Sequence, residues 1–233
     1  MGAKLDIISY ESIDYKKAFE LQLELRDKRQ KNEINDTLLL VEHPAVLTIG
    51  TSGSRDNLVV SSAYLSQKGI AVYESNRGGD ITYHGPGQIV GYPILNLKEH
   101  KQDLHWLVRS YEEVFIRLLK EYNIKAQRIK GMTGVWVGDE KITAIGVAVR
   151  RWITYHGFAF NIAPDLEHFS YIVPCGIKDK GVTSLKKLLG FELVKEEVVD
   201  KLIKYFAEVF EMEVLNYERK ISGMAEKKAA GRR

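Results

Sequence analysis

Apolar residues recur at helical spacing in two regular stretches of the chain. One stripe runs over residues 103–123, with Asp103 standing in front of it as a candidate N-cap. The other runs over residues 194–211. This spacing predicts two amphipathic helices whose apolar faces belong to the core and carry no chemistry of their own.

A third stretch, residues 12–31, has the same period in a less regular form. Ser12 is its candidate N-cap. Phe19 and Leu23 lie four residues apart and therefore share a face of the predicted helix.

Short β-rich runs bounded by Gly, Pro and Asn lie between these stretches. They predict strands over 37–42, 46–50, 70–74, 80–83, 88–96, 134–137, 141–150 and 154–161. Gly138, Asp139 and Glu140 separate two of these runs and indicate a hairpin turn. Strands grouped between helices favour an α+β fold. With no repeat or linker in view, we expect a single domain over 1–220 and a short, basic, flexible tail over 221–233.

Composition and charge remove several classes of protein. Apolar residues make up 45% and charged residues 28% of the 233, which is typical of a globular protein. No apolar run approaches the roughly 20 residues of a membrane helix, so no membrane is expected. Four basic residues and one acid in 221–233 account for the whole net charge of +3. Residues 1–220 are neutral, which argues against nucleic acid as a partner.

The cysteine and histidine patterns limit redox and metal chemistry. Cys175 is the single cysteine, so neither an internal disulfide nor a cysteine-rich zinc site is possible. The start of the chain has early acids and no apolar segment, which is unlike a signal peptide. Both observations predict a cytoplasmic protein. The six histidines lack metal-ligand spacing and no phosphate-binding glycine loop occurs, so no metal and no cofactor are expected.

A glycine-rich segment at residues 77–91 is the densest feature of the sequence. Five glycines in fifteen residues force tight turns and allow a ligand to approach the backbone closely. One interpretation is a pair of turns around a short strand. The other is a pre-formed pocket, because Arg77, Tyr83, His84 and Gln88 are polar groups on backbone that glycine and proline hold in shape.

Two further residues have both a plain and a chemical interpretation. Cys175 lies between Pro174 and Gly176, which indicates an accessible turn, although a lone cysteine is also a common buried apolar residue. Lys141 follows the hairpin turn and by default is a solvated lysine. On the opposite face of its strand, the alternating positions Ala144, Gly146 and Ala148 are small. That face therefore suits a group that packs very close to the backbone.

These pieces together resemble the octanoyltransferase family, also called lipoyl(octanoyl) transferases. The resemblance rests on Arg-Gly-Gly-x-x-Thr-Tyr-His-Gly-Pro-Gly-Gln at 77–88, Lys-Ile-x-Ala-Ile-Gly at 141–146, Arg-Arg-Trp at 150–152, Tyr-His-Gly-Phe-Ala-x-Asn at 155–161 and Pro-Cys-Gly at 174–176. The order and spacing of the motifs agree with the family, and the match runs through most of residues 35–185.

The resemblance implies a fold and an activity. The fold is that of the biotin/lipoate protein ligase catalytic domain, a mixed sheet flanked by helices. The activity is transfer of an octanoyl group from octanoyl-acyl carrier protein to a specific lysine of lipoyl domains, in 2-oxoacid dehydrogenase complexes and the glycine cleavage H protein. Because a thioester donor already stores the free energy of the amide, the reaction needs no ATP.

The resemblance also assigns roles to residues. Cys175 is the nucleophile and Lys141 lowers its pKa and moves a proton. The acyl-binding residues are Arg77, Gly78, Gly79, Asp80, Ile81, Thr82, Tyr83, His84, Ala144, Ile145, Gly146, Gly157, Phe158 and Ala159. We expect His84 to support backbone N–H groups in stabilising the oxyanion. Acidic carrier and lipoyl domains lead us to expect a basic rim drawn from Arg128, Lys130, Arg150, Arg151, Lys178 and Lys180.

Two alternatives stay open from the sequence. An ATP-dependent lipoate or biotin protein ligase shares the implied fold, and it would require ATP for turnover. A non-catalytic acyl-binding protein would keep the glycine-rich pocket and have no use for Cys175 paired with Lys141. An ordinary thiol pKa at Cys175 would favour the second alternative.

Overall fold

The computed structural model describes residues 2–173 and 180–220. The predicted nucleophile, Cys175, and the predicted tail over 221–233 lie outside the described residues. All other residues that the sequence assigned to the site lie inside them.

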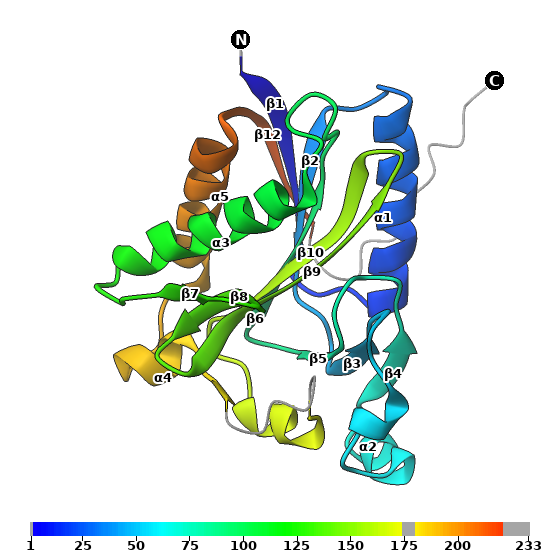
Figure 1. The fold of residues 1–233 in the computed structure, drawn as a ribbon, viewed down its shortest axis with the longest axis vertical. Helices are drawn as coiled ribbons and strands as arrows, with labels where there is room; N and C mark the ends of the chain where they lie inside the picture. Colours follow the sequence, from blue (N-terminus) through cyan, green and yellow to red (C-terminus); the bar gives the residue numbers. More distant parts are fainter. Residues whose placement is uncertain (1, 174–179, 221–233) are drawn as a thin grey trace, which may run out of the picture.

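A large mixed sheet forms the centre of the described structure (Figure 1). Its strands follow the order β12-β1-β2-β6-β10-β9-β8-β7, with β11 paired to β9. The β12-β1-β2 and β11-β9 pairs are parallel and the others antiparallel. The bounds are β1 Ala3–Tyr10, β2 Asp36–Val41, β6 Gln88–Ile94, β7 Gln127–Ile129, β8 Met132–Val137, β9 Glu140–Arg150, β10 Ile153–Asn161, β11 Gly181–Val182 and β12 Met212–Lys220.

A second, smaller sheet lies beside one end of the large one. It has the order β4-β3-β5, with β3 at Val46–Ile49, β4 at Ala71–Glu74 and β5 at Ile81–His84. The short helix α2 (Ser62–Gln67) packs on it through Leu65. The glycine-rich segment thus leaves the small sheet through β5 and enters the large sheet through β6.

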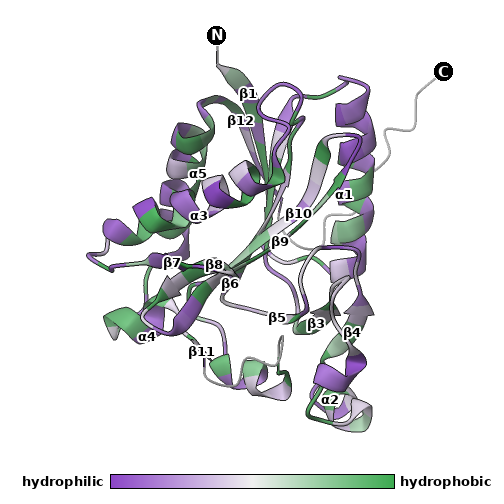
Figure 2. Cartoon of the chain, viewed as in Figure 1, coloured by the Kyte–Doolittle hydropathy of each residue, from purple (hydrophilic) through white to green (hydrophobic). Residues whose placement is uncertain are grey.

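Long helices cover both faces of the large sheet (Figure 1). Helices α3 (Leu104–Lys120) and α5 (Lys195–Phe210) share one apolar core with it, and α1 (Tyr15–Gln30) packs on the other face. Figure 2 shows both hydrophobic and hydrophilic residues along α3 and α5, as in amphipathic helices with one apolar and one polar face. Among the described residues, none of the helices is long and apolar enough to cross a membrane. Shorter helical elements lie at α4 (Leu185–Leu189), Arg55–Asn57 and Leu166–Tyr171.

The two regular helical stripes are confirmed. Asp103 is the N-cap of α3 and accepts from the backbone N–H groups of His105 and Trp106. Helix α5 begins and ends within one residue of the predicted stretch. These helices bury a full apolar stripe, so their period is visible in the sequence.

The N-cap predicted for the first helix is wrong, whereas Phe19 and Leu23 do pack, half-buried, against the core. Asp14 is the N-cap, because its carboxylate accepts from the backbone N–H groups of Lys16 and Lys17. The buried face carries Gln22 and Arg29, whereas Phe19 and Leu23 are half-buried. Polar residues face the sheet here because the sheet gives them partners. Gln22 Oε1 accepts from the His156 backbone at 2.8 Å, and Arg29 pairs with the buried carboxylate of Asp36 at 2.7 Å.

The central strands β6 and β10, which line the cavity described below, are tightly packed against each other and against α3. The Phe158 ring on β10 packs edge-on against Phe115 of α3, with ring centroids 4.8 Å apart. It also lies over Gly91 on β6, where a Cβ atom would come within 2.2 Å of the ring. Position 91 therefore accepts no side chain unless Phe158 moves.

We predict that Phe115→Ala destabilises the protein by about 3–5 kcal/mol, because it leaves a cavity beneath Phe158. Urea unfolding followed by circular dichroism measures this change. Phe191→Ala is the matched control, since Phe191 is 57% exposed, and it should change the free energy by less than about 0.5 kcal/mol. Equal effects of the two substitutions would contradict this assignment of the core.

Candidate active site

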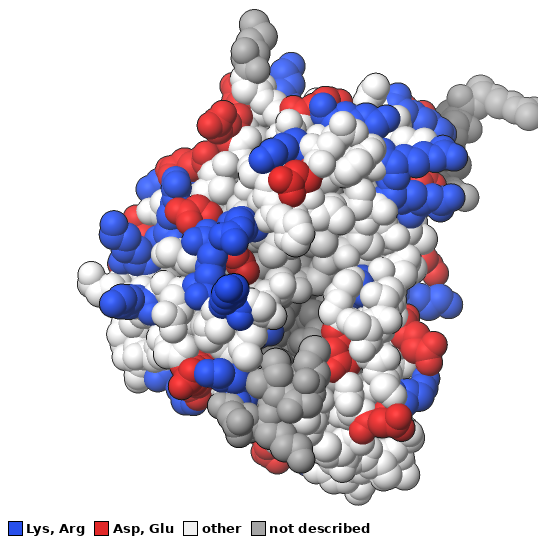
Figure 3. Space-filling model, in the orientation of Figure 1, with Lys and Arg blue, Asp and Glu red and all other residues white. Residues whose placement is uncertain are grey.

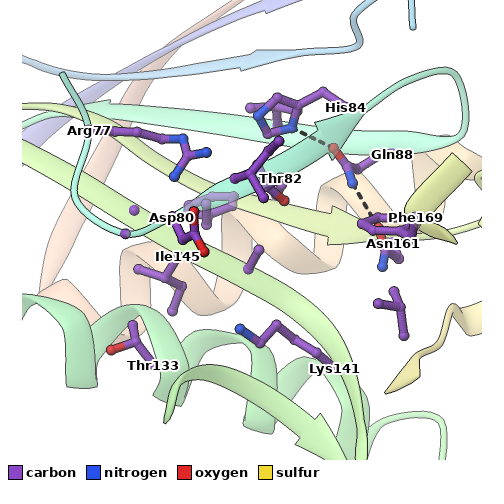
Figure 4. Close-up of a pocket in the computed structure, with 18 of the residues that line it drawn as sticks. Arg77, Asp80, Thr82, His84, Gln88, Thr133, Lys141, Ile145, Asn161 and Phe169 are labelled. Atoms are coloured by element: carbon purple, nitrogen blue, oxygen red, sulfur yellow. Dashed lines mark hydrogen bonds between the residues drawn. The ribbon is translucent and has the colours of Figure 1, made fainter. Parts of the chain in front are cut away.

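A cavity of about 340 Å³ lies between the two sheets, and Figure 4 shows residues that line it. The glycine-rich segment and β6 form one wall, β9 and β10 form another, and residues before and within β8 and β11 border it. Its apolar lining comes from aliphatic and aromatic side chains, namely Ile81, Val90, Trp136, Ile145, Phe158, Phe169, Ile172 and Val182.

The structure brings most of the sequence-predicted site residues together around this cavity. Those that line it are Arg77, Gly79, Asp80, Ile81, Thr82, His84, Lys141, Ala144, Ile145, Gly146, Gly157, Phe158 and Ala159. Gly78 and Tyr83 are not among the lining residues. The Tyr83 ring instead packs on Phe169, and its hydroxyl bonds to His168 Nδ1 at 2.8 Å.

Arg77 carries a positive charge into the wall of the cavity. The residue is 8% exposed, and the guanidinium donates to the Thr48 carbonyl at 2.6 Å, to Thr48 Oγ1 and to the Gly78 carbonyl. Within 2–173 and 180–220, no carboxylate lies at ion-pair distance from it. Burial lowers the pKa of Arg77, which nevertheless stays charged at neutral pH.

Glycines allow the backbone to close around this guanidinium. A Cβ atom at Gly50 would lie 2.9 Å from Arg77 Nη1 and 2.3 Å from the Gly79 carbonyl oxygen. At Gly146 it would lie 2.6 Å from the Gly78 carbonyl oxygen. The close packing predicted for the small-residue face of β9 is therefore confirmed at Gly146, and the segment that packs against it is the glycine-rich segment.

Lys141 lines the same cavity from the start of β9. Its Nζ lies 4.8 Å from the centroid of the Trp136 ring, within cation–π range. The pairing of β8 with β9 shifts register between Val135 and Trp136. Lys141 and Ala144, which strict alternation would place on opposite faces, consequently both reach the cavity.

Three polar side chains form a chain of hydrogen bonds across the cavity wall (Figure 4). His84 Nδ1 lies 2.8 Å from Gln88 Oε1, and Gln88 Nε2 donates to Asn161 Oδ1 at 2.8 Å. Asn161 Nδ2 then donates to the backbone carbonyl of Thr183 at 3.0 Å. The sequence analysis gave no role to Asn161, although it stands in a quoted motif.

Three buried histidines surround the inner part of the site and are neutral at pH 7. Burial, with His43 and Arg77 assisting, lowers the pKa of His84 to about 3. Burial and the Arg77 charge lower the pKa of His156 to about 3, and burial lowers that of His43 to about 4. No role was predicted for His43 or His156, because buried polar residues carry no periodic signal.

Two members of the predicted basic rim have acidic partners. Arg128 pairs with Glu112 at 3.0 Å and with Glu113 at 2.8 Å. Lys180 pairs with Asp139, and Lys178 lies outside the described residues. Figure 3 shows acidic and basic side chains interleaved over this face around the hollow. Pairing of this kind lowers the net charge that Arg128 and Lys180 contribute to an encounter.

The chain is similar to proteins of known family over most of its length. A family model described as the lipoyl protein ligase A/B catalytic domain matches residues 14–207. An octanoyltransferase of Caldicellulosiruptor saccharolyticus is 55% identical over 209 residues, which are 89% of each chain. The chain belongs to the octanoyltransferase family. Membership confirms the resemblance found in the sequence.

Solved structures confirm the fold class of this octanoyltransferase-family chain. A putative lipoate protein ligase from T. acidophilum with bound lipoic acid gives a TM-score of 0.71 at 17% identity, covering 94% of this chain and 90% of that one. Biotin protein ligase from Aquifex aeolicus gives 0.53 at 16% identity, covering 88% and 68%. At such identities the likeness concerns the fold alone, which is the predicted mixed sheet flanked by helices.

We predict that the buried histidines make this family member acid-sensitive. Unfolded histidine titrates near 6.5, so below that pH the unfolded chain binds more protons than the folded one and stability falls. A histidine with a folded pKa of about 3 should cost about 2 kcal/mol of stability between pH 7 and pH 5. Urea unfolding at pH 7 and pH 5 measures the free energy of unfolding. Between these pH values, His156→Gln should lose about 2 kcal/mol less of it than wild type loses.

His105→Gln, at an exposed position, is the control and should keep the wild-type pH dependence. If His156→Gln also keeps it, His156 is not a buried neutral imidazole in solution.

Proposed function

We propose that this protein transfers an octanoyl group from octanoyl-acyl carrier protein to a lysine of lipoyl domains. The octanoyltransferase of 55% identity, which aligns over 89% of this chain, carries the proposal. The cavity supports it, because Lys141 and an apolar lining meet there. The acceptors are lipoyl domains of 2-oxoacid dehydrogenase complexes and of the glycine cleavage H protein.

The proposed reaction has two acyl-transfer steps at Cys175. In the first, the Cys175 thiolate attacks the donor thioester carbonyl, a new thioester forms, and the carrier leaves as a thiolate that takes a proton from the Lys141 ammonium, which becomes the amine. In the second, the acceptor lysine amine attacks the acyl-enzyme, an amide forms, and Cys175 leaves as a thiolate. The Lys141 ammonium favours the thiolate electrostatically, and the amine form takes the proton that the attacking amine loses.

The cavity suits a linear saturated chain. Ile145, Phe158 and Trp136 present apolar surface that neither donates nor accepts hydrogen bonds. Each methylene removed from water contributes about 0.8 kcal/mol to binding. Arg77, His84 and His156 form a polar part of the lining, and an apolar chain gains no binding free energy by contacting it. The cavity thus favours an acyl chain that ends before it reaches these polar side chains.

The acyl-enzyme is tested by measuring the intact mass of the protein after mixing with octanoyl-acyl carrier protein. We expect wild type to gain one octanoyl group that hydroxylamine removes, because hydroxylamine cleaves thioesters. Cys175→Ser should gain no such group. An octanoyl group that survives hydroxylamine, or one that also appears on Cys175→Ser, would contradict a thioester at Cys175.

The role of Lys141 is tested by the rate of Cys175 alkylation with iodoacetamide as a function of pH. We expect an apparent thiol pKa below the ordinary value of about 8.5 in wild type, and a higher one in Lys141→Ala. Lys187→Ala is the matched control, since Lys187 is a partly exposed lysine that pairs with the neighbouring Glu140 at 2.6 Å. An ordinary pKa in wild type that Lys141→Ala leaves unchanged would remove Lys141 from the mechanism.

A further inference from the structure

The two amides of the hydrogen-bond chain have only one orientation that satisfies their neighbours. Asn161 faces the Thr183 carbonyl, an acceptor, so its amide nitrogen points there and its Oδ1 points to Gln88. Gln88 faces both Asn161 Oδ1 and the Tyr83 carbonyl, at 3.3 Å, so its nitrogen points to them. Gln88 Oε1 is therefore left to face His84 Nδ1. Backbone carbonyls, which cannot donate, fix both amides.

This orientation sets the tautomer of His84. A carbonyl oxygen of Gln88 can only accept, so His84 must carry its proton on Nδ1. Because the ring is neutral, Nε2 then has a lone pair and no hydrogen. His84 in this form has no second N–H to give a developing oxyanion, so the support expected from the sequence must come from other donors.

The chain extends beyond His84 to the buried guanidinium. Arg77 donates twice to Thr48 Oγ1, at 3.2 and 3.0 Å. The Thr48 hydroxyl hydrogen is then directed toward His84 Nε2, 3.5 Å away. Every step from Arg77 to Thr183 therefore donates in the same direction, and aligned donors of this kind polarise one another.

At its other end the chain reaches the backbone beside Lys141. The Thr183 carbonyl receives the Asn161 amide, while the Thr183 backbone N–H donates to the Lys141 carbonyl at 3.0 Å. Strand β11 is two residues long and pairs with β9, through Gly181 with Glu140 and Val182 with Lys141. The Asn161 amide adds a side-chain anchor at Thr183, directly after this short strand.

We propose that Gln88 and Asn161 are positioning residues that fix His84 as a hydrogen-bond acceptor and anchor the backbone beside Lys141 through one directional hydrogen-bond chain. The link to catalysis rests on the proposed acyl transfer, in which Lys141 moves the proton. Neither amide takes part in bond making. Each determines where the groups that do take part are held.

The orientation is tested on wild-type protein by ¹⁵N NMR of the histidine rings, with His84 assigned through His84→Gln. We expect Nδ1 to have the shift of a protonated ring nitrogen and Nε2 that of an unprotonated one at pH 7. The opposite tautomer at His84 would overturn the proposal. This measurement needs no substrate, so it stands apart from the test of acyl transfer.

The link to Lys141 is tested by Gln88→Glu, in which the ionised carboxylate cannot donate to Asn161. We expect kcat for octanoyl transfer to fall roughly 10- to 100-fold at pH 8 with little change in KM for the donor. The buried carboxyl has a raised pKa and, once protonated, donates again. The ratio of variant to wild-type kcat should therefore recover at least about threefold as the pH is lowered to 6.5.

Gln127→Glu is the matched control, because Gln127 also donates its amide to a carbonyl, that of Gly138 at 3.2 Å, on an exposed edge strand. It should keep wild-type kcat at both pH values. Equal kcat values for the two variants, or a loss in Gln88→Glu that does not depend on pH, would overturn the positioning role. A wild-type protein with the expected His84 tautomer and no octanoyl transfer would instead overturn the proposed function and leave the orientation supported.

Discussion

The site depends on one buried cation, the guanidinium of Arg77, which donates to two backbone carbonyls and a hydroxyl. A cation removed from water needs several oriented acceptors, and the Thr48 and Gly78 oxygens supply them. To bring those oxygens close enough, the backbone packs against the guanidinium at Gly50 and Gly146. The glycine that follows β3, Gly50, and the glycine on the small face of β9, Gly146, are therefore two consequences of the same constraint.

Burial and, to a smaller extent, the Arg77 charge lower the pKa values of His84 and His156. The wall of the cavity therefore holds two uncharged rings beside the Arg77 cation and the buried carboxylate of Asp80. Lys141 enters the cavity from a different element, at the start of β9. The two positive groups consequently have separate tasks. Arg77 organises the wall of the cavity, and Lys141 serves the reacting thiol in the mechanism proposed above.

The sequence predicted the helices whose apolar residues recur at a regular period and the strands that belong to the closely spaced motifs. Helices α3 and α5 bury one continuous stripe, and the central strands β6 and β10 are buried along their whole length. Strands β1 and β12 were not predicted, because β12 is mostly exposed and β1 is only partly buried, so neither has a clear alternation. The buried polar residues of α1 were not predicted, because their partners are distant in sequence.

The candidate site was predicted in its composition and not in its geometry. Motif residues such as Arg77, Ala144 and Phe158 do meet at one cavity. The bonds that orient them join residues dozens of positions apart, as between Gln88 and Asn161, and no local spacing encodes such a pair. A shift of strand register, as beside Lys141, is equally invisible in an alternating pattern.

The fold is shared with lipoate and biotin protein ligases, so the energy source for acyl transfer distinguishes the proposed reaction from one that consumes ATP. The most direct measurement is the intact mass of a purified lipoyl domain incubated with this protein and either octanoyl-acyl carrier protein without ATP or free octanoate with ATP and Mg²⁺. The account predicts octanoylation of the acceptor lysine with the carrier-bound donor alone. Octanoylation that requires free octanoate and ATP, with none from the carrier-bound donor, would contradict it.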